Sequence, residues 1–530
     1  MKKYYFIALV ATVCACNQVT AQIKLSLNKP TMDSTTENSS YPPSNAVDSD
    51  TTTKWSSSYS YKQWLYVDLQ ATCDIKKVTI QWADGCYATV FDIFFSLDAA
   101  NWTLAKTFPS NTNGTFLSID GLSGQARYVK FLGRGRANTL KGYRISDFSV
   151  YGYLPATTAQ QTEINTLTTR LLTRYAKKGV TTSEVSGYFN TILTDGRWSD
   201  LSYTTGGNWL QHPDRLQKMA LAYNKPGNLY YHDTAMLNKV AKGLSYLRRK
   251  HPGSGNWYDT TVAAPEGYMT ALIIVKNDLN PDSAQLYSTY LLDATDNYAH
   301  QGMNRAWVSG ITIHKGCIEK RYWLVDKGYS SMSDCLNIVT GTDKEGVMAD
   351  GSFHQHHDQL YTGGYGKTML EYLAYYLRHS DSLSVNTYFT QAKRQTLTDL
   401  FLGGLQLLSY GKNVDFGSAG REVSRNNSTS MLISTPMMDT MALNDTANAT
   451  AYLNWRDHIN GVGDFPSAFA GTKYFWKSAI LTSHNTGFYM SAKIISSRTY
   501  GTEGIGGKMP KVIIYRWVRQ ISCGQAMNTK

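Results

Sequence analysis

Residues 162–175, TEINTLTTRLLTRY, mark the point at which the pattern of the chain changes. Apolar side chains return every three or four residues along this stretch, at Ile164, Leu167, Leu171, Leu172 and Tyr175. This spacing is typical of one face of an α-helix. Similar segments recur to about Leu453, for example at Leu370, Leu373, Tyr376 and Leu377. Many helices separated by loops, with few strand signals, predict an α/α toroid or a helical bundle.

The part before this stretch has a different period. Short runs rich in β-branched and aromatic residues are separated by Asp, Asn, Gly and Ser, and they include WLYVDL (64–69), KKVTIQW (76–82) and ARYVKFLG (126–133). Such runs predict strands. We therefore expect a β-sandwich or jelly roll from Ile23 to Tyr153, followed by a linker, LPATTAQQ.

Alternation returns near the other end, in FYMSAKIISS (488–497). The expected fold class is therefore a multidomain α+β protein: a β-sandwich jelly roll, an α/α toroid and the start of an incomplete second β-sandwich. The predicted boundaries are 1–21 for a signal peptide, 22–153 for the first sandwich, 154–161 for the linker, 162–470 for the toroid and 471–507 for the start of the second sandwich.

Composition limits the possible functions. With 530 residues, 42% hydrophobic and 17% charged, the chain can bury several cores and is not disordered. Its 37 Tyr and 12 Trp supply apolar faces with polar edges, which sugar-binding surfaces need. The net charge of +12 indicates an anionic partner. Because the chain has no Lys/Arg-rich run, we expect an acidic polysaccharide rather than nucleic acid, bound by a monomer.

The N-terminus resembles a signal peptide. Lys2 and Lys3 precede an apolar stretch, and Val19-Thr20-Ala21 forms a cleavage site that leaves Gln22 first. A lipoprotein site at Cys16 is the alternative. We therefore expect secretion, or a periplasmic or cell-surface location. The apolar stretch is too short to span a bilayer, and no later segment has about 18 uninterrupted apolar residues.

Four cysteines fall in the predicted domains in two sequence pairs, Cys73 with Cys86 and Cys317 with Cys335. In an oxidising compartment each pair could form a disulfide bridge. Buried free thiols are an equal alternative, and the spacing indicates no metal site.

Several motifs in the first domain resemble the F5/8 type C (discoidin-like) family, especially family 32 carbohydrate-binding modules. They are LNKP (27–30), YPPSNAVDSDTTTKWSS (41–57), QWLYVDL (63–69), ARYVKF (126–131) and SDFSVYG (146–152). The resemblance implies a jelly roll that binds sugars. It also implies a structural calcium held by Asp48, Asp50, Thr53 and Asp147, although Asp147 replaces a more usual Glu. In the alternative interpretation Asp48 and Asp50 only form a turn.

The most informative stretch for chemistry is DGSFHQHHDQLYTGGYG (350–366). Its three histidines, His354, His356 and His357, could bind a metal, and its glycines could hold a phosphate. Both signals are weak, because no second ligand cluster accompanies the histidines and the glycine run lacks a GK[ST] ending. A histidine and a phenol separated by a turn, His356 and Tyr365, give the stronger interpretation.

This stretch is similar to a signature of polysaccharide lyase family 8, which contains hyaluronate, chondroitin AC and xanthan lyases. Three further segments match in order: HPGSGNWYD (251–259), QGMNRAW (301–307) and GREVSR (420–425). One departure is TTVAAPEGY (260–268), which lacks the family's E-I-G-x-P and leaves the shape of the substrate subsites open.

The resemblance implies β-elimination on a uronic acid polymer without a catalytic cofactor. Asn304 and His356 would mask the carboxylate, so that the C5 proton becomes acidic. Tyr365 would remove that proton and protonate the leaving oxygen, helped by a nearby cation. The remaining implied site residues are Arg421 and Arg425 as cations that also bind substrate, Asn256, Trp257 and Tyr258 as sugar contacts, and Glu503 as a support for the catalytic group.

The last residues break the resemblance. From Lys508 the sequence KMPKVIIYRWVRQISCGQAMNTK has no match, whereas a neighbouring reading frame allows GENAQGYYL, which resembles the continuation of the family. We interpret 508–530 as an out-of-frame tail on a truncated lyase, whose activity could be impaired.

Two other functions compete with a lyase. One is a carbohydrate-binding surface protein or adhesin with a non-catalytic helical domain. The other is a glycoside hydrolase, which needs two carboxylates across a cleft, with Asp350 and Glu422 as candidates.

Overall fold

The structure is a computed structural model, and it describes residues 22–291, 300–424, 432–462, 469–485, 488–494 and 499. The chain forms two compact units, which divide between Ala159 and Gln160. The division falls within the predicted linker. The predicted signal peptide, the tail from Lys508, Arg425 and Glu503 lie outside the described residues.

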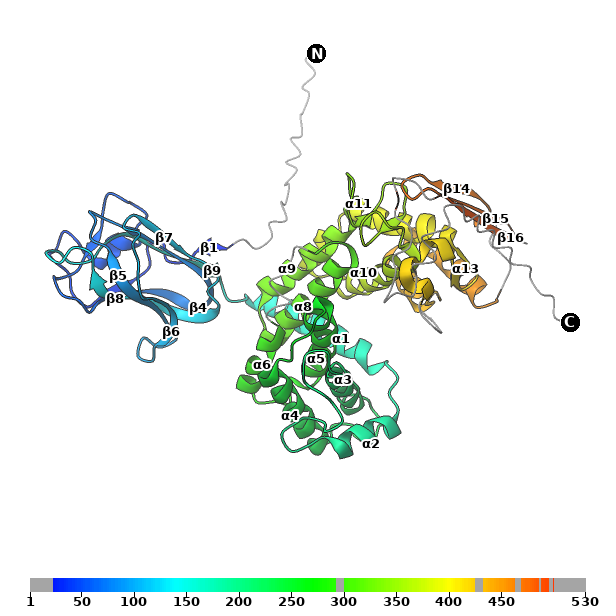
Figure 1. The fold of residues 1–530 in the computed structure, drawn as a ribbon, viewed down its shortest axis with the longest axis horizontal. Coiled ribbons are helices and arrows are strands. Elements are labelled where there is room, and N and C mark those ends of the chain that lie inside the picture. Colours follow the sequence, from blue (N-terminus) through cyan, green and yellow to red (C-terminus); the bar gives the residue numbers. More distant parts are fainter. Residues whose placement is uncertain are drawn as a thin grey trace, which may run out of the picture. The chain divides into compact units, whose positions relative to one another are not determined.

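The first unit is built from antiparallel strands (Figure 1). They are β1 (Ile23–Lys24), β2 (Thr31–Asp33), β3 (Trp55–Ser56), β4 (Gln63–Trp82), β5 (Ala88–Ser96), β6 (Thr103–Phe108), β7 (Phe116–Ile119), β8 (Gly124–Arg136) and β9 (Arg144–Tyr153). Their order is β1-β9-β4-β8-β5-β6, with β2 and β7 also on β4, and β3 on β9. The long strand β4 organises the sheet, because its first half pairs with β8 and its second half with β9.

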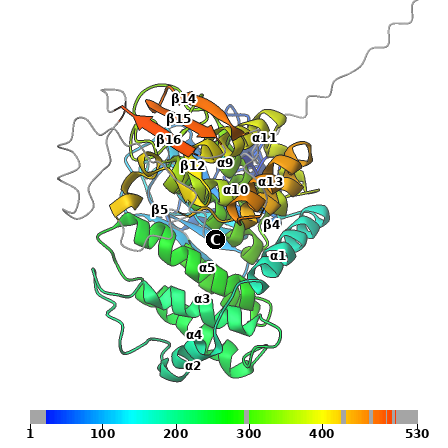
Figure 2. The ribbon, with the colours of Figure 1, turned by 90° about the vertical axis from the view of Figure 1, so that its right-hand side faces the viewer.

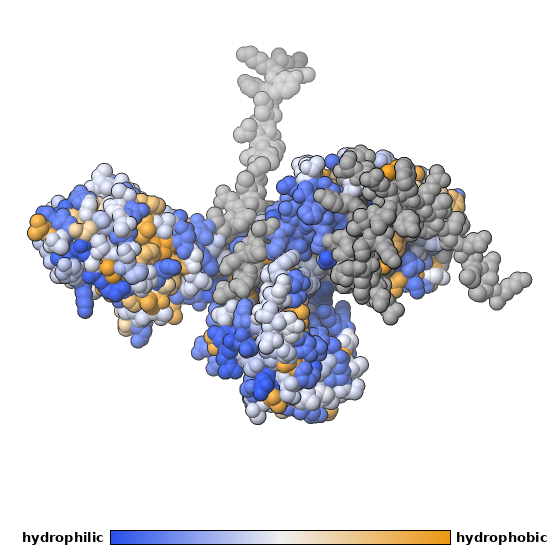
Figure 3. Space-filling view, viewed as in Figure 1, coloured by the Kyte–Doolittle hydropathy of each residue, from blue (hydrophilic) through white to orange (hydrophobic). Residues whose placement is uncertain are grey.

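Alternation along the strands explains this fold. From Gln63 to Leu69 every second residue of β4 is buried, and the residues between them are only partly covered, as expected for a strand with one face on a core. The buried face joins Trp55, Phe91, Phe131 and Phe148 in one core. Figure 3 shows exposed hydrophobic residues among hydrophilic ones on this unit, and Met32, Leu97 and Leu104 are more than half exposed.

The second unit is mainly helical. Its helices are α1 (Thr158–Ala176), α2 (Thr182–Thr191), α3 (Gln211–Tyr223), α4 (Thr234–Lys250), α5 (Ala264–Val275), α6 (Pro281–Ser288), α8 (Gly302–Glu319), α9 (Tyr322–Ser333), α10 (Lys367–His379), α11 (Gln391–Thr398), α12 (Pro436–Asn444) and α13 (Ala449–Ile459). Helix α5 is buried at nearly every position, since its residues are apolar all round. It packs against α3 and α8, and α8 packs against α9.

The first helix of this unit begins earlier than the sequence pattern indicates. Helix α1 begins at Thr158, within the linker predicted for 154–161 and four residues before the predicted start at Thr162. After Pro155 the chain has no further proline or glycine up to Ala176, so nothing prevents the helix from starting early.

Strands follow the helices in the same unit: β14 (Gly471–Phe475), β15 (Ile480–Asn485) and β16 (Phe488–Lys493), paired in chain order. In Figure 1 and Figure 2 they lie on the opposite side of this unit from α2–α4. Phe475 and Ile480 share a small core with Leu360 and Leu408. The predicted fold class, a β-sandwich followed by a helical toroid-like domain and then further strands, is confirmed.

Cys73, Cys86, Cys317 and Cys335 are all free and buried. Of the two alternatives for these cysteines, the structure has buried thiols rather than bridges. Burial raises the pKa of Cys317 to about 11 and that of Cys335 to about 12, so both thiols stay protonated. Among the described helices, none is long and apolar enough to cross a bilayer.

Glu266 of α5 is a half-buried carboxyl whose pKa departs from its ordinary value. Burial raises the pKa of Glu266 to about 7, although a hydrogen bond from Tyr372 Oη at 3.0 Å and the charges of Lys178 and Arg174 act in the opposite direction. The folded state therefore holds a proton that the unfolded chain releases at about pH 4.5. Stability should fall as the pH rises from about 4.5 through 7.

Glu266→Gln cannot ionise and should remove this loss. Relative to the native chain, the variant should gain on the order of 2 kcal/mol of unfolding free energy between pH 5 and pH 8. Urea unfolding of the helical unit at both pH values measures the gain. A difference between variant and native chain that does not change with pH would contradict the assignment.

Candidate active site

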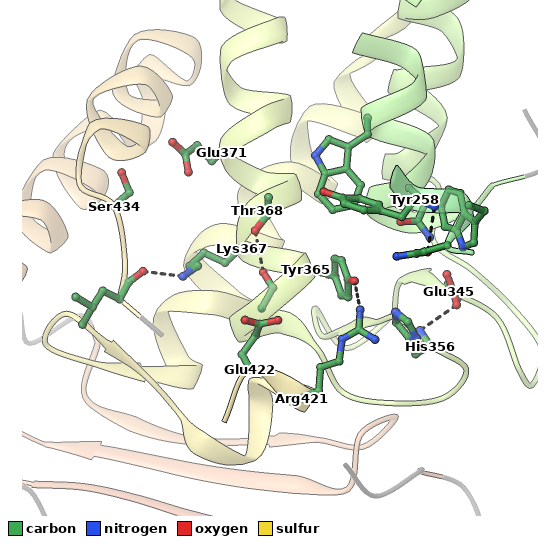
Figure 4. A pocket seen from close by; sticks show the side chains of 16 residues that line it. Tyr258, Glu345, His356, Tyr365, Lys367, Thr368, Glu371, Arg421, Glu422 and Ser434 are labelled. Atoms are coloured by element: carbon green, nitrogen blue, oxygen red, sulfur yellow. Dashed lines mark hydrogen bonds between the residues drawn. The ribbon is translucent and has the colours of Figure 1, made fainter. Parts of the chain in front are cut away.

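A cavity of about 910 Å³ lies in the second unit (Figure 4). Its walls are formed by the turn before α5, the start of α8, the loop that precedes α10, α10 itself and the two segments on either side of 425–431. The lining residues are Asn256, Trp257, Tyr258, Asn304, Trp307, Glu345, His356, Gly364, Tyr365, Lys367, Thr368, Glu371, Arg421, Glu422, Leu432 and Ser434.

The loop before α10 carries His356 and Tyr365. It runs from the hairpin of β10 (Gly346–Val347) and β11 (Phe353–His354) to a π-helical turn (Thr362–Gly366), which continues directly into α10. His356 and His357 adopt left-handed backbone angles, with φ of 56° and 68°. Non-glycine residues rarely adopt such angles, and they occur where the surroundings hold them in place.

The three histidines of this loop do not converge on a metal. His354 is buried, and its Nε2 lies 2.8 Å from Ser478 Oγ. His357 Nδ1 lies 2.5 Å from Asp343 Oδ1 on the surface. Only His356 lines the cavity. Across the described part of the chain, no group of three or more His, Cys, Asp or Glu side chains is placed to hold a metal ion.

Tyr365 lies between two of the other predicted residues. Arg421 Nη2 donates a hydrogen bond of 2.6 Å to Tyr365 Oη. The rings of His356 and Tyr365 are stacked, with centroids 5.4 Å apart and planes at 24°. A guanidinium at this distance stabilises negative charge on the phenol oxygen. The phenol, the imidazole and the cation therefore occupy one wall of the cavity.

Tyr361 sets the position of Arg421. The backbone N–H of Arg421 donates to Tyr361 Oη at 3.0 Å, and burial raises the pKa of Tyr361, which therefore stays neutral. Gly420, with φ of 55°, packs its Cα against the Tyr361 ring. Arg421 is thus held at its backbone by one tyrosine and at its side chain by the other.

Asn304 enters the cavity from the first turn of α8. The preceding residue, Met303, donates its N–H to Gln355 Oε1 at 3.0 Å. Gln355 Nε2 in turn donates to Glu345 Oε2, and the His356 N–H donates to Glu345 Oε1 at 2.9 Å. Glu345 therefore links the start of α8 to the loop that carries His356. These hydrogen bonds fix the positions of Asn304 and His356 relative to each other.

Aromatic rings cover one end of the cavity. Trp257 is 46% exposed, and Tyr258 packs edge-on against Trp307 with ring centroids 5.2 Å apart. Trp307 also meets the Tyr365 ring at 5.9 Å. Half-exposed aromatic faces beside polar groups are suited to stacking on sugar rings.

The glycosidase pair does not form. Asp350 is buried and is absent from the cavity lining; its carboxylate accepts hydrogen bonds from Ser352 and from the backbone N–H of Lys477. Of these two carboxylates, only Glu422 lines the cavity.

The sequence prediction omitted Trp307, Glu345, Lys367, Thr368, Glu371, Leu432 and Ser434, which also line the cavity. Helical spacing could have indicated some of them. Trp307 is three residues after Asn304 in α8, and Thr368 is three residues after Tyr365. Glu345 directly precedes β10, outside any helix, and gave no such signal.

The four predicted calcium ligands lie in the first unit. Asp48, Asp50 and Thr53 form one turn, and Asp147 lies in β9. Thr53 Oγ1 donates to Asp48 Oδ2 at 2.8 Å and to the Asp50 carbonyl at 2.9 Å, and this turn of hard oxygen donors fits Ca²⁺. Asp147 instead accepts from Lys24 Nζ at 2.8 Å. Lys24 Nζ also donates to Ser49 Oγ at 2.6 Å, which joins Asp147 to this turn through the lysine. Calcium binding by the four residues stays a prediction.

Comparison with known proteins assigns both units. The sequence profile of the polysaccharide lyase family 8 N-terminal α-helical domain matches residues 164–461, more than half of the chain. The F5/8 type C domain profile matches residues 31–147. The chain belongs to polysaccharide lyase family 8, and it carries an F5/8 type C module before the helical domain.

Parts of the chain are similar in sequence to two curated relatives, and one solved structure shares its fold. The chain is 27% identical over 183 residues to a hyaluronate lyase of Enterococcus faecalis, covering 30% of this chain and 18% of that protein. It is 24% identical over 245 residues to the chondroitinase-AC of Pedobacter heparinus, covering 44% and 34%. A chondroitinase AC lyase structure shares the fold with a TM-score of 0.58 and 17% identity, covering 65% of this chain and 52% of that one. These alignments span about a fifth to a third of the curated relatives.

Gly420 allows a test of how Arg421 is held. A Cβ built there would lie 2.3 Å from the Tyr361 ring, and the backbone φ already disfavours other residues. Gly420→Ala should cost about 2–3 kcal/mol of unfolding free energy and also lower any activity that depends on Arg421. Denaturant unfolding measures the loss.

Gly411 is a matched control. It has a φ of 53°, but a Cβ there would have no neighbour within 4 Å. Gly411→Ala should therefore show the backbone cost alone, about 1 kcal/mol. Equal losses in the two variants would show that the contact with Tyr361 is unimportant.

Proposed function

We propose that the chain is an exported polysaccharide lyase that cleaves a uronic-acid-containing polysaccharide of the hyaluronan or chondroitin type by β-elimination. The observation that supports this most is the convergence of Asn304, His356, Tyr365 and Arg421 on one cavity. The relatives named above are hyaluronate and chondroitin lyases. Export would use the predicted signal peptide, and the F5/8 type C module would bind sugar.

Asn304 and His356 would bind the uronate carboxylate. Hydrogen bonds to that group spread the negative charge that develops when C5 loses its proton, and this lowers the barrier to proton removal. The hydrogen bonds through Gln355 and Glu345 would keep Asn304 and His356 at a constant separation.

Tyr365 would act as base and then as acid. Its phenolate oxygen, stabilised by Arg421, takes the C5 proton; the C5–H electrons form the C4=C5 double bond as the C4–O4 bond breaks. The leaving O4 receives a proton from the tyrosine. The products are a saturated chain end and an unsaturated uronate. Arg425 and Glu503 would add substrate binding and support, as the family resemblance implies.

Tyr365→Phe should lower turnover by about 10³-fold, because it removes the proton-transfer group and leaves the ring packing unchanged. Ultraviolet absorbance of the unsaturated uronate, formed from hyaluronan or chondroitin, measures turnover. Tyr231→Phe, an exposed tyrosine outside the cavity, is the control and should be fully active.

Binding and product formation, measured for both the native chain and Tyr365→Phe, distinguish a lyase from a non-catalytic adhesin. If Tyr365→Phe binds polysaccharide as well as the native chain does but yields no unsaturated product, the catalytic assignment holds. If the native chain binds polysaccharide and also forms no unsaturated product, the non-catalytic binding protein is the better description. Unchanged turnover in Tyr365→Phe would exclude Tyr365 as the base.

Arg421→Met should shift the pH profile of kcat/KM. Without the guanidinium 2.6 Å from its oxygen, the phenol ionises less readily, so the limb that reports the ionised base moves to higher pH. The variant should therefore recover part of its lost activity in alkaline buffer. A uniform loss with an unmoved profile would assign Arg421 to substrate binding alone.

A further inference from the structure

A buried aspartate organises a short turn in the second unit. Asp415 is 4% exposed, and its Oδ1 accepts a hydrogen bond of 2.7 Å from the N–H of Gly417. The Asp415 carbonyl accepts from Ser418 Oγ at 2.9 Å and from the Ser418 N–H at 3.0 Å. Asp415 thus caps the 3₁₀ turn Phe416–Ser418, as aspartates do at the start of helical turns. Residues 415–418 are called the Asp415 turn below.

Strand β16 contacts this turn through two side chains. Because side chains alternate along a strand, Tyr489, Ser491 and Lys493 share the more buried face of β16. Tyr489 Oη donates to Asp415 Oδ2 at 2.9 Å, and Lys493 Nζ donates to the Gly417 carbonyl at 2.8 Å. Burial lowers the pKa of Lys493 to about 8, although the charge of Asp415 acts in the opposite direction. The strand therefore binds the turn at two points.

The Asp415 turn also packs against the turn that carries Tyr365. A Cβ built on Gly363 would lie 2.7 Å from Ser418 Oγ and 3.0 Å from Val414 Cβ. These distances leave no room for a side chain, so the two backbones approach closely. Gly363 lies two residues before Tyr365, and Arg421 lies three residues after Ser418. The position of the Asp415 turn therefore affects the separation of the two segments that meet at 2.6 Å in Figure 4.

Titratable groups lie around both Asp415 and Tyr365. Those near Asp415 are Tyr410, His484, Tyr489 and Lys493. Those near Tyr365 are Glu345, His356, Tyr361, Lys367, Arg421 and Glu422. Burial raises the pKa of Tyr489, so this phenol is neutral near pH 7. Replacing it by Phe therefore leaves every charge around Tyr365 in place and changes only how the Asp415 turn is held.

We propose that Asp415 is a positioning residue for Arg421. Tyr489 and Lys493 of β16 hold the Asp415 turn, and the turn keeps the guanidinium at the Tyr365 oxygen. The kinetic consequence rests on the proposed function. If the turn shifts, the charge-assisted hydrogen bond to Tyr365 lengthens or loses its alignment, and it weakens steeply with both. The phenolate is then less stabilised and forms at higher pH.

Tyr489→Phe tests the proposal, because it removes the hydrogen bond to Asp415 and retains the ring, which packs edge-on against His484 with centroids 4.6 Å apart. On hyaluronan or chondroitin, the limb of the kcat/KM profile that reports ionised Tyr365 should move to higher pH. A move of about one pH unit lowers kcat/KM about tenfold at neutral pH, where little of the phenol is ionised. Lys493→Met removes the other hydrogen bond from β16 and should move the limb in the same direction.

Tyr388→Phe is the matched control. Tyr388 is 8% exposed and donates to Asp326 Oδ1 at 2.8 Å, outside the cavity. It loses the same kind of buried hydrogen bond, so both variants should lower the denaturant midpoint by similar amounts. Only Tyr489→Phe should move the pH limb. Similar losses of stability with an unmoved limb in both variants would overturn the proposal. If Tyr489→Phe does not fold, Lys493→Met decides by the same criterion.

Replacement of Asp415 separates geometry from charge. Asp415→Asn can still accept from the Gly417 N–H and can donate to the Tyr489 oxygen, so it should retain the native pH limb. Asp415→Ala can do neither and should move the limb to higher pH. An equal move in both variants would assign the effect to the charge of Asp415 and reject the positioning role.

Failure of the lyase proposal gives a different result, namely no unsaturated product from the native chain. The ionisation of Tyr365 is then measured without turnover, by ultraviolet difference titration of a chain against the same chain with Tyr365→Phe. The midpoint should be higher with Tyr489→Phe present than in the native chain. Equal midpoints would reject the positioning of Arg421 by β16, whatever the substrate.

Discussion

The hydrogen bond from Arg421 to Tyr365 is the contact on which the cavity depends. It joins two segments 56 residues apart at 2.6 Å and places a permanent positive charge beside a phenol. Neither segment is a long helix: one is a π-helical turn and the other a short 3₁₀ turn. Both are therefore held by their surroundings, through the Tyr361 ring, the close approach of Gly420 and the start of α10.

The strands β14–β16 supply part of that support without contributing a lining residue. Ser478 Oγ donates to Ser352 Oγ at 2.7 Å and lies 2.8 Å from His354 Nε2. Burial lowers the pKa of His354 to about 4, so it stays neutral at physiological pH. Because buried polar groups are costly unless they are bonded, this cluster ties the hairpin before the His356 loop to the turn between β14 and β15. The sheet is thus part of the architecture of the site.

The chemical groups that line the cavity differ from one part of it to the next. Trp257 and Tyr258 lie at one end of the cavity, the Arg421 guanidinium lies beside Tyr365, and Asn304 and His356 also line it. A polymer of alternating acidic and neutral sugars is complementary to such a series. The overall charge of +12 favours a polyanionic partner, as the proposed function requires.

The sequence by itself determined the classes of structure and the chemical groups. A period of two in the first part and of 3.6 after residue 162 predicted the sandwich and the helices, because burial on one face imposes those periods. The ordered motifs identified Asn304, His356, Tyr365 and Arg421, since the resemblance resides in residue types at fixed spacings. The start of α1 was predicted four residues late, because local propensity determines where a helix can begin while periodicity shows only where it packs.

Only the tertiary structure decided which side chains share the cavity and in what state. The role of Glu345 depends on contacts with Gln355 and His356 that form when a hairpin closes on α8. The cavity depends on α10 and the Arg421 segment meeting across a space. The thiols stay free because packing buries Cys73 in β4, Cys86 in the following turn, Cys317 in α8 and Cys335 in a 3₁₀ turn, with no disulfide between them. Contacts between residues far apart in the chain follow from packing, and packing is a property of the whole fold rather than of any local spacing.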